Sequence, residues 1–188
     1  MPTVISHALV PLTIAIAAGP KRIPPKVALI GAALAMLPDL DVIGLRLGVP
    51  YDSAWGHRGA MHSLAMGAIL VTGMAAFVPP LRKGWSLPFL FLAFASHGLI
   101  DTMTDGGRGV ALLWPFDATR YFAPWRPIRV SPIGAGFFTA RGMATAISEL
   151  QWIWLPCLLV AASALISRRI LGKTKGALSV DGFDTPNI

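Results

Sequence analysis

The chain has 188 residues, of which 54% are hydrophobic and 13% are charged. Because soluble domains carry about a quarter charged residues, this composition excludes an ordinary soluble protein and indicates that lipid surrounds much of the chain. The net charge is +7, but the basic residues lie mostly between and beside apolar runs. That placement favours anionic headgroups or a phosphate-bearing substrate, and we expect no nucleic-acid partner. The single cysteine, Cys157, excludes a disulfide framework or a thiolate metal site within one chain.

Five apolar segments follow one another along the chain, each about long enough to cross ~30 Å of hydrocarbon. They cover residues 3–19, 27–47, 62–78, 85–103 and 150–170. No basic residue precedes the first segment, as it would in a signal peptide, so we expect a retained helix. The sequence therefore predicts an all-α, multi-pass transmembrane bundle of about five spans over residues 1–172. A flexible C-terminal tail is expected over residues 173–188.

The basic residues that flank the spans predict an orientation. Residues 21–26, 82–83 and 168–175 are basic, and they fall on one side of a five-span protein. All five lysines lie on this side, and the basic residues of the other side are all arginine. By the positive-inside rule the lysine side is cytoplasmic, so the N-terminus is expected outside and the C-terminus in the cytoplasm.

A long outer segment, residues 105–149, mixes aromatic side chains with arginine and proline. This mixture suits the headgroup zone, and we expect the segment to lie on the membrane surface and cap the bundle. Its arginines either anchor to headgroups or bind phosphate or carboxylate groups in a bidentate manner. The arginines of this side that we consider are Arg58, Arg108, Arg120, Arg126, Arg129 and Arg141.

All four histidines and the main aspartates fall in the outer half of the predicted bundle. His7 is 14 residues from Lys21, and His97 is 14 residues from Lys83. At 1.5 Å per residue each lies about 20 Å from the cytoplasmic boundary, and a similar count holds for Asp39. Ionisable groups at such a depth are costly and need partners, for which a divalent metal is suited. The candidate ligands are His7, Asp39, Asp41, His57, His62, His97 and Asp101.

Local spacing refines this set. His97 and Asp101 are four residues apart and share a helix face. Asp39 and Asp41 point the same way only if the chain there is extended, which the sequence leaves open, and either could instead end a helix. Mixed imidazole and carboxylate ligands suit Zn, Mn or Fe(II) better than Mg or Ca. The number of candidates is enough for two metals, although a buried hydrogen-bonded pair is the simpler interpretation of His97 and Asp101.

Four short segments read LPDLD at 37–41, HRGAMHS at 57–63, SHGLIDTMT at 96–104 and LLWPF at 112–116. In order and spacing they resemble the membrane-bound metal-dependent hydrolase family of bacterial inner membranes. The resemblance implies a hydrolase in the bacterial inner membrane, a bound metal, and roles for the seven candidate ligands. The His97-x-x-x-Asp101 step is more weakly similar to zinc-dependent phospholipase C, but those proteins use later histidines that this chain lacks.

We therefore expect a metal-dependent hydrolase, most simply with zinc, that acts on a lipid or a lipid-linked phosphate ester. A carboxylate among Asp39, Asp41 and Asp101 that is not a ligand is the expected general base. Arg58 is the expected clamp for an anionic group of the substrate. The alternatives are a metal or proton transporter, which needs polar residues in both membrane halves, and a non-catalytic membrane protein with a structural metal, which is usually bound by cysteine.

Overall fold

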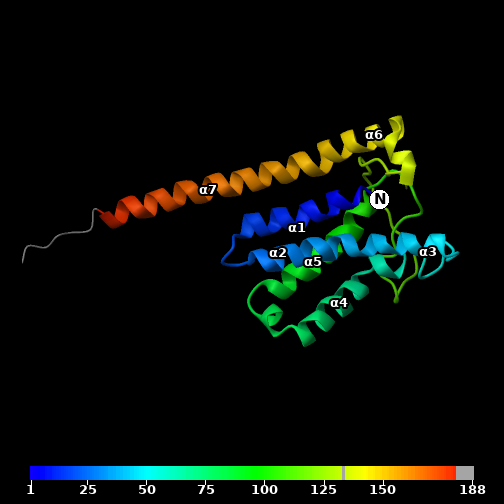
Figure 1. The fold of residues 1–188 in the computed structure, drawn as a ribbon, viewed down its shortest axis with the longest axis horizontal. Coiled ribbons are helices and arrows are strands. Elements are labelled where there is room, and N and C mark those ends of the chain that lie inside the picture. The colour runs from blue at the N-terminus through cyan, green and yellow to red at the C-terminus, as the bar shows by residue number, and fades with distance from the viewer. Residues whose placement is uncertain (133, 181–188) are drawn as a thin grey trace, which may run out of the picture.

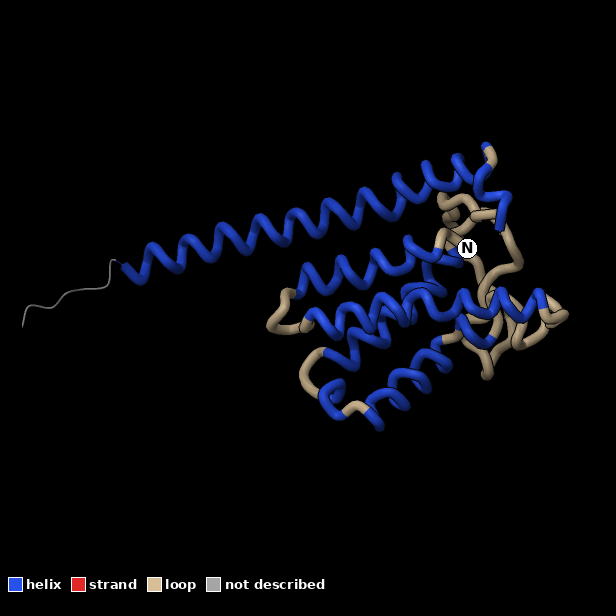
Figure 2. Tube along the Cα trace, viewed as in Figure 1, coloured by secondary structure: helices blue, strands red, loops and turns tan. Residues whose placement is uncertain are grey.

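The computed structural model describes residues 1–132 and 134–180, and in this part of the chain the regular structure is helical, with no β-strand (Figures 1 and 2). The predicted all-α class is confirmed. The elements in chain order are α1 (Val4–Ala18), α2 (Pro25–Met36), η1 (Leu37–Asp41), α3 (Val42–Arg46), η2 (Ala60–His62), α4 (Leu64–Phe77), η3 (Pro79–Arg82), α5 (Ser86–Thr102), η4 (Gly134–Phe138), α6 (Ala140–Glu149), the π-helical η5 (Leu150–Trp154) and α7 (Leu155–Val180).

The helices run back and forth along one axis. α2 packs between α1 and α5, α4 packs on α5, and α7 lies along α1 and extends beyond the bundle (Figure 1). The linkers over residues 19–24 and 78–85 lie at one end, and the N-terminus and the long loops over 47–59 and 103–132 lie at the other. The basic linkers thus share one end of the bundle.

Two helical stretches in the described part are long and apolar enough to cross a membrane. They are Pro25–Arg46, with 22 residues, and Ala140–Leu171, with 32 residues. Helices α1, α4 and α5 are apolar but contain 15, 14 and 17 residues, fewer than the ~20 that a straight crossing needs. The number of about five spans therefore stays a prediction.

The last helix begins earlier than the sequence analysis predicts. Residues 140–149, expected to belong to the outer cap, form α6, which continues through η5 into α7. Alanine is a strong helix former and recurs in this stretch, and the helix buries one face that includes Thr145 and Glu149. The predicted flexible segment, 173–188, starts inside α7, and residues 181–188 lie outside the described part.

Local chemistry explains where the helices begin and end. Gly19 ends α1 with a φ of 85°, which glycine adopts at no steric cost, and its N–H donates to the Ala15 carbonyl. Pro25 starts α2, where its missing N–H leaves no helical bond unmade. The Ser63 hydroxyl caps α4 by accepting from the Met66 N–H at 3.1 Å.

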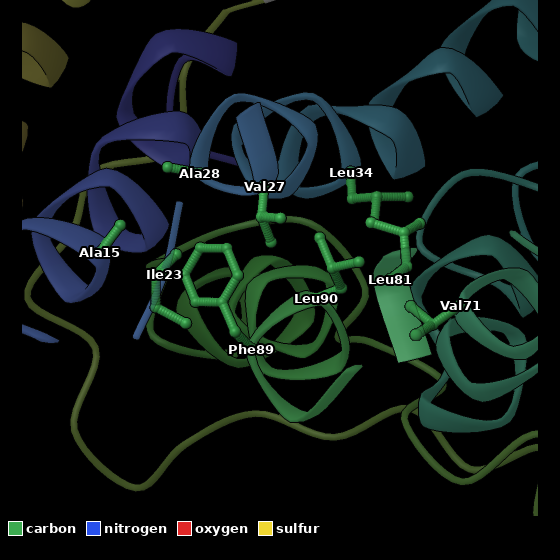
Figure 3. Packing of buried hydrophobic residues seen from close by; sticks show 9 residues of the cluster. All are labelled: Ala15, Ile23, Val27, Ala28, Leu34, Val71, Leu81, Phe89 and Leu90. Atoms are coloured by element: carbon green, nitrogen blue, oxygen red, sulfur yellow. The ribbon is translucent and has the colours of Figure 1, made fainter. Parts of the chain in front are cut away.

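The apolar core lies toward the linker end of the bundle (Figure 3). The core includes residues of the linker after α1, of η3 and of helices α1, α2, α4 and α5. Its buried members are Ala15, Ile23, Val27, Ala28, Leu34, Val71, Leu81, Phe89 and Leu90. Packing between the helices is therefore apolar at the basic end, and the buried histidines and aspartates lie toward the opposite end.

Helix α7 exposes an apolar surface along most of its described length. A surface of this kind on a helix suits contact with lipid or with another apolar partner. The exposed apolar side chains of α7 are Leu155, Leu158, Leu159, Val160, Leu165, Ile166, Ile170 and Leu171.

Candidate metal centre

The short turn η1 positions two of the predicted aspartates. Pro38 cannot donate a backbone hydrogen bond, and the chain changes from α to 3-10 geometry at this point. The chain is not extended here, yet both carboxylates reach the same imidazole. Asp39 Oδ1 lies 3.9 Å from His62 Nε2, and Asp41 Oδ2 lies 3.1 Å from His62 Nδ1. His62 therefore lies between the two aspartates, and each meets a different ring nitrogen.

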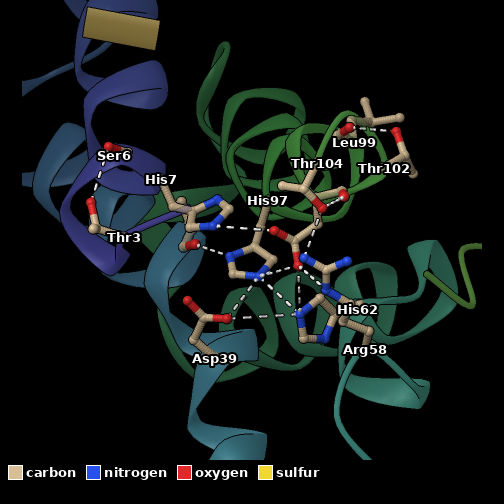
Figure 4. Close-up of polar contacts among 12 residues, drawn as sticks. Thr3, Ser6, His7, Asp39, Arg58, His62, His97, Leu99, Thr102 and Thr104 are labelled. Carbon is tan, nitrogen blue, oxygen red and sulfur yellow. Dashed lines mark hydrogen bonds and ion pairs between the residues drawn. The ribbon is translucent and has the colours of Figure 1, made fainter. Parts of the chain in front are cut away.

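Four buried side chains from three separate segments form the centre of the site (Figure 4). They are Asp39, His62, His97 and Asp101, and their ligand atoms all lie within 4.8 Å of one another. His97 Nε2 is 3.0 Å from His62 Nε2 and 3.4 Å from Asp39 Oδ1. His62 Nε2 is 3.5 Å from Asp101 Oδ2. Ligands at about 2.0–2.2 Å from a tetrahedral metal are roughly 3.3–3.6 Å apart. The separations here run from 3.0 Å between the two Nε2 atoms to 4.0 Å between His97 and Asp101, so small side-chain shifts would let the set hold one cation.

The carboxylates of the centre accept no hydrogen bond. Both oxygens of Asp39 and both oxygens of Asp101 are buried without a hydrogen-bond donor among the described residues, and Asp101 Oδ2 has an ion pair with Arg58 Nε at 3.1 Å. A buried carboxylate without a partner is costly, and a cation removes that cost. The donor set therefore suits a divalent metal on chemical grounds as well as on distance.

A freed backbone carbonyl orients His97. In a 3-10 turn residue 38 would donate to the carbonyl of residue 35, but Pro38 has no N–H. The Ala35 carbonyl accepts instead from His97 Nδ1 at 2.7 Å. Because a carbonyl only accepts, Nδ1 donates to it, and Nε2 faces the space between Asp39 and His62. Such contacts behind a ligand fix its tautomer and its direction.

Asp41 and His57 lie behind His62. Asp41 accepts from the Arg58 backbone N–H at 3.1 Å, and its other oxygen is 2.6 Å from His57 Nδ1. Asp41, His57 and His62 are also close enough to form a second ligand group. The 2.6 Å separation, however, is that of a hydrogen bond and is shorter than the distance between two ligands of one metal. We therefore interpret Asp41 and His57 as orienting residues for His62.

His7 reaches the centre from α1. Its ring stacks on the ring of His97 with the centroids 3.7 Å apart, and its Nε2 lies 3.6 Å from Asp101 Oδ1. Both ring nitrogens are buried without a hydrogen-bond partner among the described residues. The structure thus brings all seven predicted ligands together, with four at the centre and His7 beside it.

The side chain of Arg58 is fully buried. Its Nε lies 3.1 Å from Asp101 Oδ2, and its other nitrogens donate to the Thr104 hydroxyl and the Gly106 carbonyl, each at 3.0 Å. Arg58 has a φ of 64°, which is unusual for a residue other than glycine. The Ala111 N–H bonds its carbonyl at 3.0 Å and helps to hold this conformation. Arg58 faces protein groups here, and its role as a substrate clamp stays a prediction.

Two further residues support the site: Glu149, which the sequence analysis missed, and Arg120, which it considered only for binding to headgroups, phosphate or carboxylate. Glu149 accepts from the Thr3 N–H at 2.7 Å and from the hydroxyls of Thr3 and Ser6, each at 2.6 Å, so it ties α6 to α1. It is the only glutamate of the chain and stands at the edge of an apolar run, which was an available signal. Arg120 donates to the backbone carbonyl of His57 at 2.9 Å, and burial lowers the pKa of its guanidinium.

The fold and the site together define a helical membrane protein with a buried histidine and carboxylate centre at one end of its bundle. The chain belongs to the YdjM inner membrane protein family, whose sequence model matches residues 1–173. It is 44% identical over 174 residues to the inner membrane protein YbcI of Escherichia coli strain K12. The alignment covers 90% of this chain and 100% of that protein. No solved structure matches the chain. These relatives support the predicted inner-membrane location, and their names say nothing of hydrolysis or of metal.

Proposed function

We propose that the protein is a metal-dependent hydrolase of the inner membrane. The observation that carries the proposal is the set of buried carboxylate oxygens of Asp39 and Asp101, which accept no hydrogen bond and face the Nε2 atoms of His62 and His97. These four residues would hold the metal, with Zn favoured over Mn and Fe(II) for a small mixed set. A cation bound there would polarise the scissile group and supply hydroxide at neutral pH.

The neighbouring side chains have distinct roles in this proposal. His7, with both ring nitrogens unpartnered beside Asp101, takes the proton of the attacking water and returns it to the leaving group. Arg58 holds Asp101 in place through the 3.1 Å contact. Asp41 and His57 hold His62. The proposed general base is therefore an imidazole and not one of the carboxylates considered above. In this proposal Asp39 and Asp101 serve as ligands, and Asp41 contacts His57 and His62.

The proposal includes the position of the protein in the membrane. Five spans, with the N-terminus outside and the C-terminus cytoplasmic, are supported by the basic linkers at one end of the bundle and the centre at the other. A site at that depth favours a lipid or a phosphate ester linked to one. The transporter alternative would need polar groups through the basic end, where the packing between the helices is apolar.

Elemental analysis of the detergent-purified protein tests the metal. We expect about one equivalent of Zn in the wild type and in Asp52→Asn, an exposed aspartate outside the centre, and a loss of metal in His97→Ala and Asp101→Asn. The wild type is then assayed on phospholipids and on soluble esters. A wild type that holds no metal after purification without chelators and attempted reconstitution would overturn the proposal, as would a metal-loaded protein that cleaves neither class.

A further inference from the structure

The arginines near the site differ in whether they have partners. Of the six outer arginines considered above, Arg58 and Arg120 bind protein groups as described. Arg108 pairs with Asp52, and Arg126 lies over the Phe122 ring with its guanidinium carbon 4.8 Å from the centroid. The remaining two, Arg129 and Arg141, have side chains with no hydrogen bond or ion pair to any described residue.

Arg129 and Arg141 line the same cavity, which has a volume of about 320 Å³. Asp105 also lines it, but its Oδ1 accepts from the Val130 N–H at 2.8 Å. Both side chains are exposed, and two positive charges at one cavity raise its potential and favour an anion there. Their planar, forked donors match the oxygens of a phosphate.

A second, apolar cavity of about 680 Å³ adjoins the first. Ser131 and Pro132 line it directly after the residues that line the arginine cavity, and Ala146 of α6 lines it directly after Thr145. The two cavities therefore share the segment 129–132 and helix α6 as walls. The acidic group of the apolar cavity, Glu149, is already engaged by three donors.

From this pairing we infer that the two cavities bind one anionic phospholipid. Its phosphate lies between Arg129 and Arg141, and an acyl chain occupies the apolar cavity. Both volumes are in the range of small-molecule sites, about 300–1,000 Å³. The arginine cavity suits the phosphate of such a lipid, and the apolar cavity suits its acyl chain. A free anion would leave the apolar cavity unfilled, and a neutral lipid would leave the arginine charges without a counterion.

The lipid would lie against the metal centre. The Gly106 carbonyl, at the wall of the arginine cavity, accepts from Arg58, whose Nε is 3.1 Å from Asp101. Thr3, at the wall of the apolar cavity, is one helical turn from His7. As a substrate site the inference rests on the proposed function, but as a binding site it is measured without turnover.

Quenching of tryptophan fluorescence by phosphatidylglycerol with brominated acyl chains tests the inference, because Trp154 lines the apolar cavity. The probe is titrated into full-length, chelator-treated protein in detergent. We expect saturable quenching that is largely lost in Trp154→Phe and is weak with brominated phosphatidylcholine. Arg129→Gln with Arg141→Gln should weaken binding by about tenfold or more, whereas Arg126→Gln, an outer arginine outside both cavities, should change it little.

Three results would overturn the inference. They are equal binding of the two phospholipids, an unchanged affinity in the double arginine variant, and full displacement of the lipid by inorganic phosphate. A wild-type melting temperature shows that the double variant is folded, and Arg129→Lys with Arg141→Lys should retain part of the affinity because it keeps the charge. If lipid binding follows the expected pattern while no hydrolysis occurs, the inference stands and the proposed function fails. If hydrolysis occurs without this binding pattern, the proposed function stands and the inference fails.

Discussion

Pro38 affects the centre because proline has no backbone N–H. Without its N–H, the Ala35 carbonyl is available to His97 Nδ1 at 2.7 Å. We expect Pro38→Ala to restore a competing donor and to weaken metal binding by about ten- to a hundredfold, as is common when a group behind a ligand is lost. Competition with a metal-binding dye measures this affinity.

The control for this prediction is Pro79→Ala, which changes a proline at the opposite end of the bundle, in η3. Its metal affinity should equal that of the wild type. An unchanged affinity in Pro38→Ala would show that His97 does not need the Ala35 carbonyl.

Replacement of His7 distinguishes a role in metal binding from a role in catalysis. If the ring carries protons and is not a ligand, His7→Ala should keep about the wild-type metal content and lose roughly 10²- to 10⁴-fold in kcat. Elemental analysis and initial rates on the same preparation make the comparison. Loss of metal together with activity would instead make His7 a fifth ligand, as the sequence analysis expected.

The seven residues around the centre could be predicted because ionisable groups are conspicuous in apolar segments. Their division into ligands and orienting groups could not, because it depends on which atom of each ring meets which partner. Asp39 and Asp41 illustrate this point: they approach opposite nitrogens of His62 across a 3-10 turn that no spacing rule specifies. Glu149 was missed because its partners are more than 140 residues away in the sequence.

At the scale of elements, α5 packs closely on the loop that carries His62. A Cβ added at Gly98 would lie 2.8 Å from the His62 carbonyl oxygen and 3.0 Å from Leu112 Cδ2. Gly98→Ala should therefore cost about 1–3 kcal/mol and lower the metal content, since backbone must move. Thermal unfolding with and without chelator measures both effects.

Gly73→Ala is the matched control, because no atom lies within 4 Å of a Cβ built at this position of α4. It should leave the metal content unchanged and be neutral or slightly stabilising, as alanine favours a helix. Equal behaviour of the two variants would contradict the close contact at Gly98.

Glu149 joins the last helical unit to the first helix. Glu149→Ala would leave the Thr3 N–H and the two hydroxyls of Thr3 and Ser6 without their acceptor. We expect a loss of about 3 kcal/mol in the free energy of unfolding, with Glu149→Gln losing less. Both variants should retain metal, which distinguishes this effect from damage to the centre. A wild-type melting temperature in Glu149→Ala would refute it.

At the scale of the whole molecule, the order of the helices and their alternating direction follow from the apolar runs and the breaks between them. The boundary of the last helix did not follow, because the polar residues of α6 resemble a surface loop when the contacts with α1 and the 129–132 segment are unknown. The segments predicted for α1, α4 and α5 exceed the helices by one or two residues at each end, where the flanking residues do not adopt helical geometry.

The predicted orientation is tested by cysteine labelling in a Cys157→Ser background. Lys83→Cys lies at the basic end of the bundle, and Thr119→Cys lies in the long loop at the other end, with both positions exposed. In intact cells whose outer membrane has been permeabilised, an impermeant maleimide should label Thr119→Cys and leave Lys83→Cys unlabelled until the inner membrane is opened. The reverse pattern would invert the topology and place the centre on the cytoplasmic side.

The helical unit over residues 140–180 comes last in the chain, and every candidate ligand lies between His7 and Asp101. All candidate ligands have therefore been synthesised by the time the ribosome reaches Thr139. The last helix then packs along α1, where Glu149 accepts a hydrogen bond from Ser6. If the centre holds a cation as proposed, the order of synthesis lets the cation bind before the final helix packs on α1.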